Sequence, residues 1–143
     1  MPDKLYQQAI LNKAREAVGA GTMEDADARA TVNNPVCGDR VTIEVRLSDG
    51  RIAAVAHKVR GCLLCEAAAS VIGANAPGAT PKQIAAARAA VTALLKDGTE
   101  IPADGWAELS IFQPVTTHKS RHHCVLLPFE ALSHALEEAQ SAN

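Results

Sequence analysis

The sequence predicts an α+β fold, in which a three-stranded antiparallel sheet packs against helices. Apolar and polar residues alternate from Val41 to Leu47, which is typical of a strand with one buried face. Ser48-Asp49-Gly50 then supplies a tight turn, and a second strand returns from Ile52 to Val59. Segments with helical spacing stand on both sides of this hairpin. Their order predicts one sheet face covered by helices.

The segment before the hairpin predicts one helix and a shorter strand. Apolar residues recur at three- and four-residue intervals from Leu5 to Val18, and Gly19 ends the helix. The acidic stretch that follows, about Thr22 to Ala30, is expected to be mostly loop. A strand around Arg29–Asn33 completes the sheet, which puts Cys37 in the loop between the first two strands.

The segment after the hairpin predicts helices alone, so the element order is α-β-β-β-α-α-(α)-α. A helix is expected from about Glu66 to Pro77-Gly78, close behind Cys62. Thr80-Pro81-Lys82-Gln83 is a capping box with proline at the first helical position, and its helix runs to about Leu95. The remaining elements are a short helix or loop within Gly105–Val115 and a last helix over about Pro128–Ala139, which places Cys124 just before its start.

Length and composition exclude several classes of protein. The 143 residues are expected to form a single domain, 1–143, with a mostly aliphatic core, because 48% of residues are hydrophobic and 3% are aromatic. A net charge of -2 provides no basic surface for nucleic acid. No apolar run is long enough to cross a bilayer, and no secretory signal opens the chain. We therefore expect a cytoplasmic protein with no nucleic-acid or membrane partner and with reduced cysteines.

The four cysteines stand in three short stretches. These read Asn34-Pro35-Val36-Cys37-Gly38-Asp39, Arg60-Gly61-Cys62-Leu63-Leu64-Cys65 and Arg121-His122-His123-Cys124. Each stretch lies at the edge of a predicted element, so the fold can assemble one shared site from them. Cysteines in a reducing compartment are better interpreted as ligands or nucleophiles than as disulfides. The candidate ligands are Cys37, Asp39, Cys62 and Cys124, with His123 as an alternative ligand.

Three thiols and one carboxylate suit a soft, four-coordinate metal site. Thiolates favour zinc, which binds tetrahedrally, and iron–sulfur centres, where four ligands hold a [2Fe-2S] cluster. Cys62, near a helix N-terminus, and Cys124, beside cationic residues, are expected to deprotonate readily. Two assignments stay open. Asp39 is either a ligand or a turn residue after Gly38, and Cys37 is either a reachable thiolate or a small buried side chain.

Cys65 is the cysteine that a four-ligand site does not need. A lone Cys62-Leu63-Leu64-Cys65 motif is typical of a thioredoxin-like redox pair, but the βαβ pattern that accompanies such pairs is absent. Cys65 is therefore either a core thiol on the first helical turn, an auxiliary metal ligand or a resolving thiol beside Cys62.

Taken in order, the three stretches resemble the U-type iron–sulfur cluster assembly scaffolds, the family of IscU, SufU and the N-terminal domain of NifU. Members carry N-P-x-C-G-D, then G-C before a helix of small residues, then a third cysteine at the last helix. The resemblance extends from Tyr6 to about Leu136 and implies the SufE/NifU-like fold. The long interval between Cys62 and Cys124 is closer to SufU, whereas His123 is closer to IscU.

The resemblance implies a scaffold rather than an enzyme. Such a protein accepts sulfur from a cysteine desulfurase, holds a labile [2Fe-2S] cluster or a zinc ion, and passes clusters to apo iron–sulfur recipient proteins. Its ligands would be Cys37, Asp39, Cys62 and Cys124, with Cys124 and Cys37 as candidate persulfide acceptors. One alternative is a SufU-type zinc-dependent sulfurtransferase that accepts persulfide without building clusters. Another is a structural zinc domain that acts only as a binding module.

Overall fold

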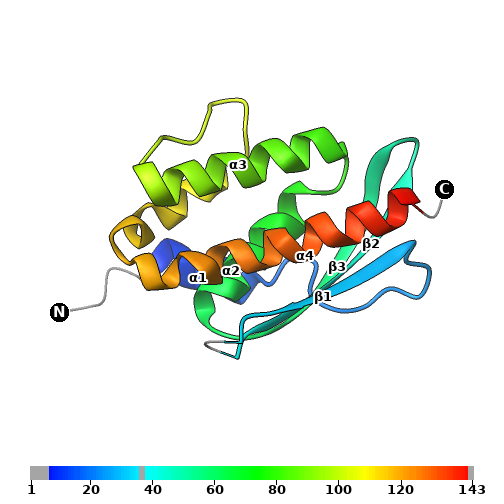
Figure 1. The fold of residues 1–143 in the computed structure, drawn as a ribbon, viewed down its shortest axis with the longest axis horizontal. Coiled ribbons are helices and arrows are strands. Elements are labelled where there is room, and N and C mark those ends of the chain that lie inside the picture. The colour runs from blue at the N-terminus through cyan, green and yellow to red at the C-terminus, as the bar shows by residue number, and fades with distance from the viewer. Residues whose placement is uncertain (1–6, 36–37, 142–143) are drawn as a thin grey trace.

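The computed structural model, which describes residues 7–35 and 38–141, confirms the predicted α+β fold and its element order (Figure 1). The helices are α1 (Gln8–Glu16), α2 (Leu63–Asn75), α3 (Pro81–Asp97) and α4 (His122–Ser141), with the 3-10 helices η2 (Ala107–Thr117) and η3 (Lys119–Arg121) before α4. The strands are β1 (Ala28–Asn33), β2 (Arg40–Ser48) and β3 (Arg51–Arg60). The ambiguous segment Gly105–Val115 lies mostly in η2.

The sheet has the antiparallel order β1-β2-β3, and its register decides which loops meet. Arg40, the first residue of β2, pairs with Asn33 at the end of β1 and with Arg60 at the end of β3. The loop between β1 and β2 and the exit from β3 therefore leave the same end of the sheet. At the other end, Asp49 and Gly50 form the predicted tight turn, with φ angles of 53° and 76°.

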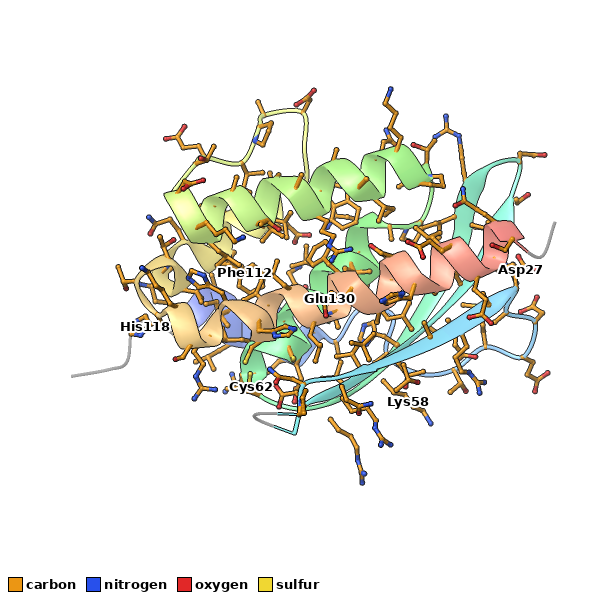
Figure 2. The ribbon with its side chains drawn as sticks, in the orientation of Figure 1. Asp27, Lys58, Cys62, Phe112, His118 and Glu130 are labelled. Carbon is orange, nitrogen blue, oxygen red and sulfur yellow. The ribbon has the colours of Figure 1, made fainter. Side chains whose placement is uncertain are left out.

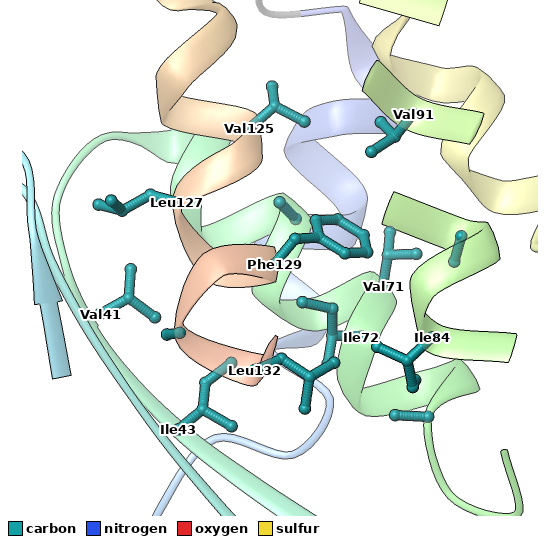
Figure 3. Close-up of a cluster of buried hydrophobic side chains, with 14 of the residues drawn as sticks. Val41, Ile43, Val71, Ile72, Ile84, Val91, Val125, Leu127, Phe129 and Leu132 are labelled. Carbon is teal, nitrogen blue, oxygen red and sulfur yellow. The ribbon is translucent and has the colours of Figure 1, made fainter. Parts of the chain in front are cut away.

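Helices cover one face of the sheet in two layers (Figure 1). α4 packs over β1 and β2 and α2 packs over β3, whereas α3 lies beyond them, against α4 and η2. Figure 3 shows the core that joins the layers: Val41 and Ile43 of β2 face Leu127 and Leu132 of α4, and Phe129 turns toward α2 and α3. Burying an aliphatic or aromatic side chain of this size contributes about 1.5–3 kcal/mol. This core fixes α2 and α4 against the sheet.

The last helix begins earlier than the sequence analysis predicts. α4 starts at His122 rather than near Pro128, so Cys124 lies in its first turn and not before it. The prediction is wrong because proline favours the first turn of a helix, whereas Pro128 stands in the helix interior. Proline has no N–H, and in an α-helix the donor missing at Pro128 is the one that would reach the carbonyl of Cys124.

The other helix ends follow their local signals. Thr80 and Gln83 form both hydrogen bonds of the predicted capping box, and Gly98, with φ 71°, ends α3. α1 ends at Glu16, slightly before the predicted Val18, because Ala17 turns into the left-handed region with φ 44°. Its predicted start at Leu5 lies outside the described residues. Within residues 7–35 and 38–141, no helix has both the length and the apolar character needed to cross a membrane.

The chain after α1 is held between α2 and the outer edge of β3. The Val18 N–H donates to Ser70 Oγ on α2 at 3.0 Å, and the Val18 carbonyl accepts from His57 Nε2 at 2.7 Å. The His57 N–H donates to the Gly19 carbonyl at 3.0 Å. Gly73 permits this approach, because a Cβ built there would lie 1.8 Å from the Val18 carbonyl oxygen. Because Gly73 has no side chain, the segment after α1 can pack between α2 and β3.

Gly73→Ala is expected to lower the free energy of unfolding by about 3 kcal/mol or more, because the added methyl group overlaps backbone that three elements hold in place. Urea denaturation measures this change. Gly50→Ala is the matched control: no atom lies within 4 Å of its added Cβ, so only the left-handed φ opposes it, at about 1 kcal/mol. Equal losses in the two variants would contradict the close contact at Gly73.

Candidate metal centre

Three of the predicted ligands come together at one end of the sheet. The ligand atoms of Asp39, Cys62 and Cys124 all lie within 4.8 Å of one another. Asp39 ends the loop between β1 and β2, Cys62 precedes α2 and Cys124 lies in the first turn of α4, so three separate elements build this ligand group. Figure 2 shows Cys62 at this end of the sheet, under α4 in that view. Cys37, the fourth predicted ligand, lies outside the described residues.

The sheet brings Asp39 to the group. The terminal pair of the β2–β3 ladder, Arg40 with Arg60, sets Asp39 beside Gly61. The contact is close, because a Cβ built at Gly61 would lie 2.7 Å from Asp39 Cγ. The Asp39 carbonyl accepts a hydrogen bond from the Asn34 N–H at 2.8 Å, which closes the loop. Asp39 is 6% exposed, so its carboxylate faces the ligand group and not solvent.

Cys62 is the N-cap residue of α2 and the most accessible member of the group. The positive end of the helix dipole favours a thiolate at this position. Hydrogen bonds from the thiols of Cys124 and Cys65 lower the pKa of Cys62 far below that of an ordinary thiol. The same interaction with Cys62 raises the pKa of both donors. The arrangement therefore favours a thiolate at Cys62 over one at Cys65 or Cys124, so the expectation of ready deprotonation is confirmed in direction for Cys62 and wrong for Cys124.

Cys65 lies in the core directly behind the ligand group. Its side chain is fully buried, and its Sγ is 3.0 Å from the carbonyl oxygen of Cys124 and 3.5 Å from Asp39 Oδ2. Its Sγ is not one of the three ligand atoms that lie within 4.8 Å of one another. In this position Cys65 is a hydrogen-bond donor to the residues that carry the ligands.

His123, the alternative ligand, points elsewhere. Its Nε2 lies 3.3 Å from Glu130 Oε2, and about half of its side chain is exposed. In Figure 2, Glu130 lies further along α4, away from Cys62. Its neighbour His122 is bound to the carbonyls of Val115 and Thr116, both at 3.1 Å. Neither ring is part of the group formed by Asp39, Cys62 and Cys124.

Among the residues that the structure describes, this group has the chemistry of a soft metal site with three ligands. Two sulfur atoms and one carboxylate oxygen match ligands that zinc accepts, and thiolates are the usual ligands of iron in clusters. Cys124 is 2% exposed, so the core shields this ligand, whereas Cys62 is partly accessible to solvent. A fourth donor from the loop that contains Cys37, or from an incoming molecule, would complete the coordination.

Sequence reasoning misses two residues that shape this site. Gly61 enters the sequence analysis only as part of a motif, although a glycine next to a predicted ligand can signal close backbone approach. Pro128 is predicted to start a helix, and no local pattern distinguishes that role from an interior proline. Both residues act through what they lack: Gly61 has no Cβ and Pro128 has no N–H.

The sequence is similar to a known protein family and to several known proteins. A family model described as the NifU-like N terminal domain matches residues 5–141. The iron-sulfur cluster assembly scaffold protein IscU 1 of Archaeoglobus fulgidus is 29% identical over 132 residues, which are 92% of this chain and 74% of that protein. The zinc-dependent sulfurtransferase SufU of Bacillus subtilis is 22% identical over 142 residues, 99% of this chain and 95% of that protein.

A solved structure resembles the whole chain. The N-terminal part of a nitrogen-fixing NifU-like protein from Brucella abortus superimposes with a TM-score of 0.92 and is 33% identical in sequence. The match covers 99% of this chain and 98% of that structure. The fold is therefore a shared feature of a recognised group of proteins.

Gly61→Ala is expected to weaken zinc binding by about 10- to 100-fold, because the new Cβ displaces the Asp39 carboxylate without removing any ligand. Competition with a chromophoric chelator measures the affinity. The control is Gly61→Ala in an Asp39→Ala background, where the overlapping carboxyl atoms are gone and no further loss is expected. Unchanged affinity in the single variant would show that Asp39 does not contribute to binding.

Proposed function

Because the chain belongs to the NifU-like N-terminal domain family, we propose that it is a scaffold on which iron–sulfur clusters are assembled and from which they are transferred. The observation that carries the proposal is the convergence of Asp39, Cys62 and Cys124 from three separate elements. We propose that residues 1–143 form the scaffold as one domain. We expect it to act in the cytoplasm, where thiols stay reduced.

Sulfur would arrive from a cysteine desulfurase as a persulfide. In this step a scaffold thiolate attacks the outer persulfide sulfur, a new S–S bond forms on the scaffold, and the desulfurase cysteine leaves as thiolate. Cys124 and Cys37 are the proposed acceptors. Supporting Cys124 is its position within the ligand group, because sulfur received there is delivered beside Cys62 and Asp39. The Cys124 thiol is hydrogen-bonded to the Cys62 thiolate, which would take its proton before Cys124 attacks.

The cluster is cargo in this proposal, and Cys37, Asp39, Cys62 and Cys124 would hold it until a recipient apo-protein accepts it. Three of these ligands are soft thiolates, whereas the Asp39 carboxylate is hard and binds cluster iron less firmly. A mixed set of this kind suits a cluster that must be released. The accessible side at Cys62 supports transfer, since a recipient can approach there.

A zinc-dependent sulfurtransferase is the second candidate function. It is favoured by the similarity to SufU, which extends over 99% of this chain, and by a donor set that zinc accepts. This protein would take persulfide sulfur from the desulfurase and pass it on without building a cluster. The two functions share their sulfur donor and differ in whether iron is retained.

Anaerobic reconstitution tests the proposal. The protein is incubated with ferrous iron, cysteine and a cysteine desulfurase, and in parallel with ferrous iron and inorganic sulfide. A scaffold develops visible absorption from sulfur-to-iron charge transfer in both reactions and then converts apo-ferredoxin to its holo form. Persulfide on the protein without iron retention in either reaction would instead identify a sulfurtransferase. Cys62→Ser should abolish cluster formation in both reactions.

Asp39→Ala is expected to slow transfer of the cluster to apo-ferredoxin by about tenfold, an increase of about 1.4 kcal/mol in the barrier. The weak carboxylate ligand is removed, and a thiol from solution that fills the position holds iron more firmly. The cluster should still assemble on the variant. Asp104→Ala, at an exposed loop position, is the control and should transfer at the wild-type rate. An unchanged rate in Asp39→Ala would remove Asp39 from the release step.

A further inference from the structure

The interior proline of α4 leaves a specific carbonyl without its helical partner. In an α-helix the carbonyl of residue i accepts from the N–H of residue i+4, and for Cys124 that residue is Pro128, which has no N–H. Cys124 is 2% exposed and Pro128 is buried, so this part of the helix faces the core. A buried carbonyl with no donor is unfavourable, so another donor is needed here.

The thiol of Cys65 is that donor. Its Sγ lies 3.0 Å from the Cys124 carbonyl oxygen, closer than the 3.5 Å to Asp39 Oδ2. A thiol carries one proton, so the Cys124 carbonyl, Asp39 and the Cys62 thiolate compete for it. Cys62 also accepts from the Cys124 thiol and from the backbone N–H groups of Cys65 and Leu64, whereas the Cys124 carbonyl has lost its helical donor at Pro128. Cys65 lies in the first turn of α2, three residues after the N-cap residue Cys62. The bond therefore joins the first turn of α2 to the first turn of α4.

We infer that Cys65 is a positioning residue for the ligand group: its S–H replaces the helical hydrogen bond that Pro128 removes and holds Cys124 against Cys62. The inference rests on the proposed function only in taking Cys62 and Cys124 as ligands. Cys65 does not bind the metal in this assignment. A Cys65 that became a thiolate ligand would give up its proton and leave the Cys124 carbonyl without a donor.

The arrangement explains why a fourth cysteine stands so close to the ligands without joining them. Cys62 and Cys124 stand at the starts of two different helices, so their separation depends on how the two first turns are held. A side chain at position 65 that fills the space but cannot donate would let the first turn of α4 relax. The Cys124 thiol would then move relative to Cys62 and Asp39.

A double-mutant cycle on the full chain tests the link between Cys65 and Pro128. Cobalt(II) serves as the probe, because its visible spectrum reports both the number of thiolate ligands and the geometry around the metal. Cys65→Ala should weaken cobalt binding by about tenfold or more and shift the ligand-field bands. Cys65→Ser, whose hydroxyl donates to the same carbonyl, should stay within about twofold of wild type. Urea denaturation of the metal-free variants reports stability separately.

Pro128→Ala supplies the decisive background, because the substituted residue has a backbone N–H that restores the helical hydrogen bond to the Cys124 carbonyl. In that background Cys65→Ala should change cobalt affinity by less than about twofold, although it leaves the same cavity. An equal loss with and without Pro128 would overturn the inference, since the effect would then come from the cavity. A loss of stability with unchanged affinity and spectrum would also overturn it, by making Cys65 merely structural.

Further outcomes separate this inference from the proposed function. A sulfur-to-cobalt charge-transfer band that weakens equally in Cys65→Ser and Cys65→Ala would make Cys65 a ligand and overturn the positioning role. Cobalt binding through thiolates in a protein that fails to assemble clusters would refute the scaffold function and leave the positioning role intact. Failure of the wild-type protein to bind cobalt through thiolates would overturn the inference, because no ligand group would exist to position.

Discussion

The candidate site depends on one pair of residues in the sheet, Arg40 of β2 opposite Arg60 of β3. This pair is the last one in the β2–β3 ladder. The residue just before β2 and the residue just after β3 therefore leave the sheet at the same point. Asp39 and Gly61 are those residues, and the absence of a Cβ at Gly61 lets the carboxylate lie against the backbone that leads to Cys62. A shift of register by one residue would turn the Asp39 side chain to the other face of the sheet. The register is itself fixed by the core, because Val41 and Ile43 must face α4 (Figure 3).

The same core holds the elements that carry the ligands. The fully buried side chains of β2, α2, α3 and α4 form one continuous cluster, and the ligand group lies at its end. A small structural zinc domain, by contrast, takes much of its folding free energy from the metal. Here α2 and α4 bring Cys62 and Cys124 together because the two helices pack on a common sheet. This organisation fits a protein that gains and loses its cargo while its fold persists.

Much of this fold can be predicted from sequence because its signals are local. The alternation from Val41 to Leu47, the Asp49-Gly50 turn and the capping box at Thr80 each act within a few residues. The site is predictable to the extent that its motif resembles a known family, which points to Asp39, Cys62 and Cys124 without any knowledge of their proximity. The start of α4 is not predictable, because Pro128 is tolerated inside the helix only through tertiary contacts.

The central claim is that the fold assembles a mixed sulfur and oxygen ligand set from separate elements. X-ray absorption at the zinc edge of the zinc-loaded protein measures that set directly. The account predicts a four-coordinate ion with three sulfur atoms at about 2.3 Å and one oxygen at about 2.0–2.2 Å, and loss of the oxygen or its replacement in Asp39→Ala. A shell of four sulfur atoms would contradict the account by bringing Cys65 into the ligand set in place of Asp39, and a shell without sulfur would contradict it altogether.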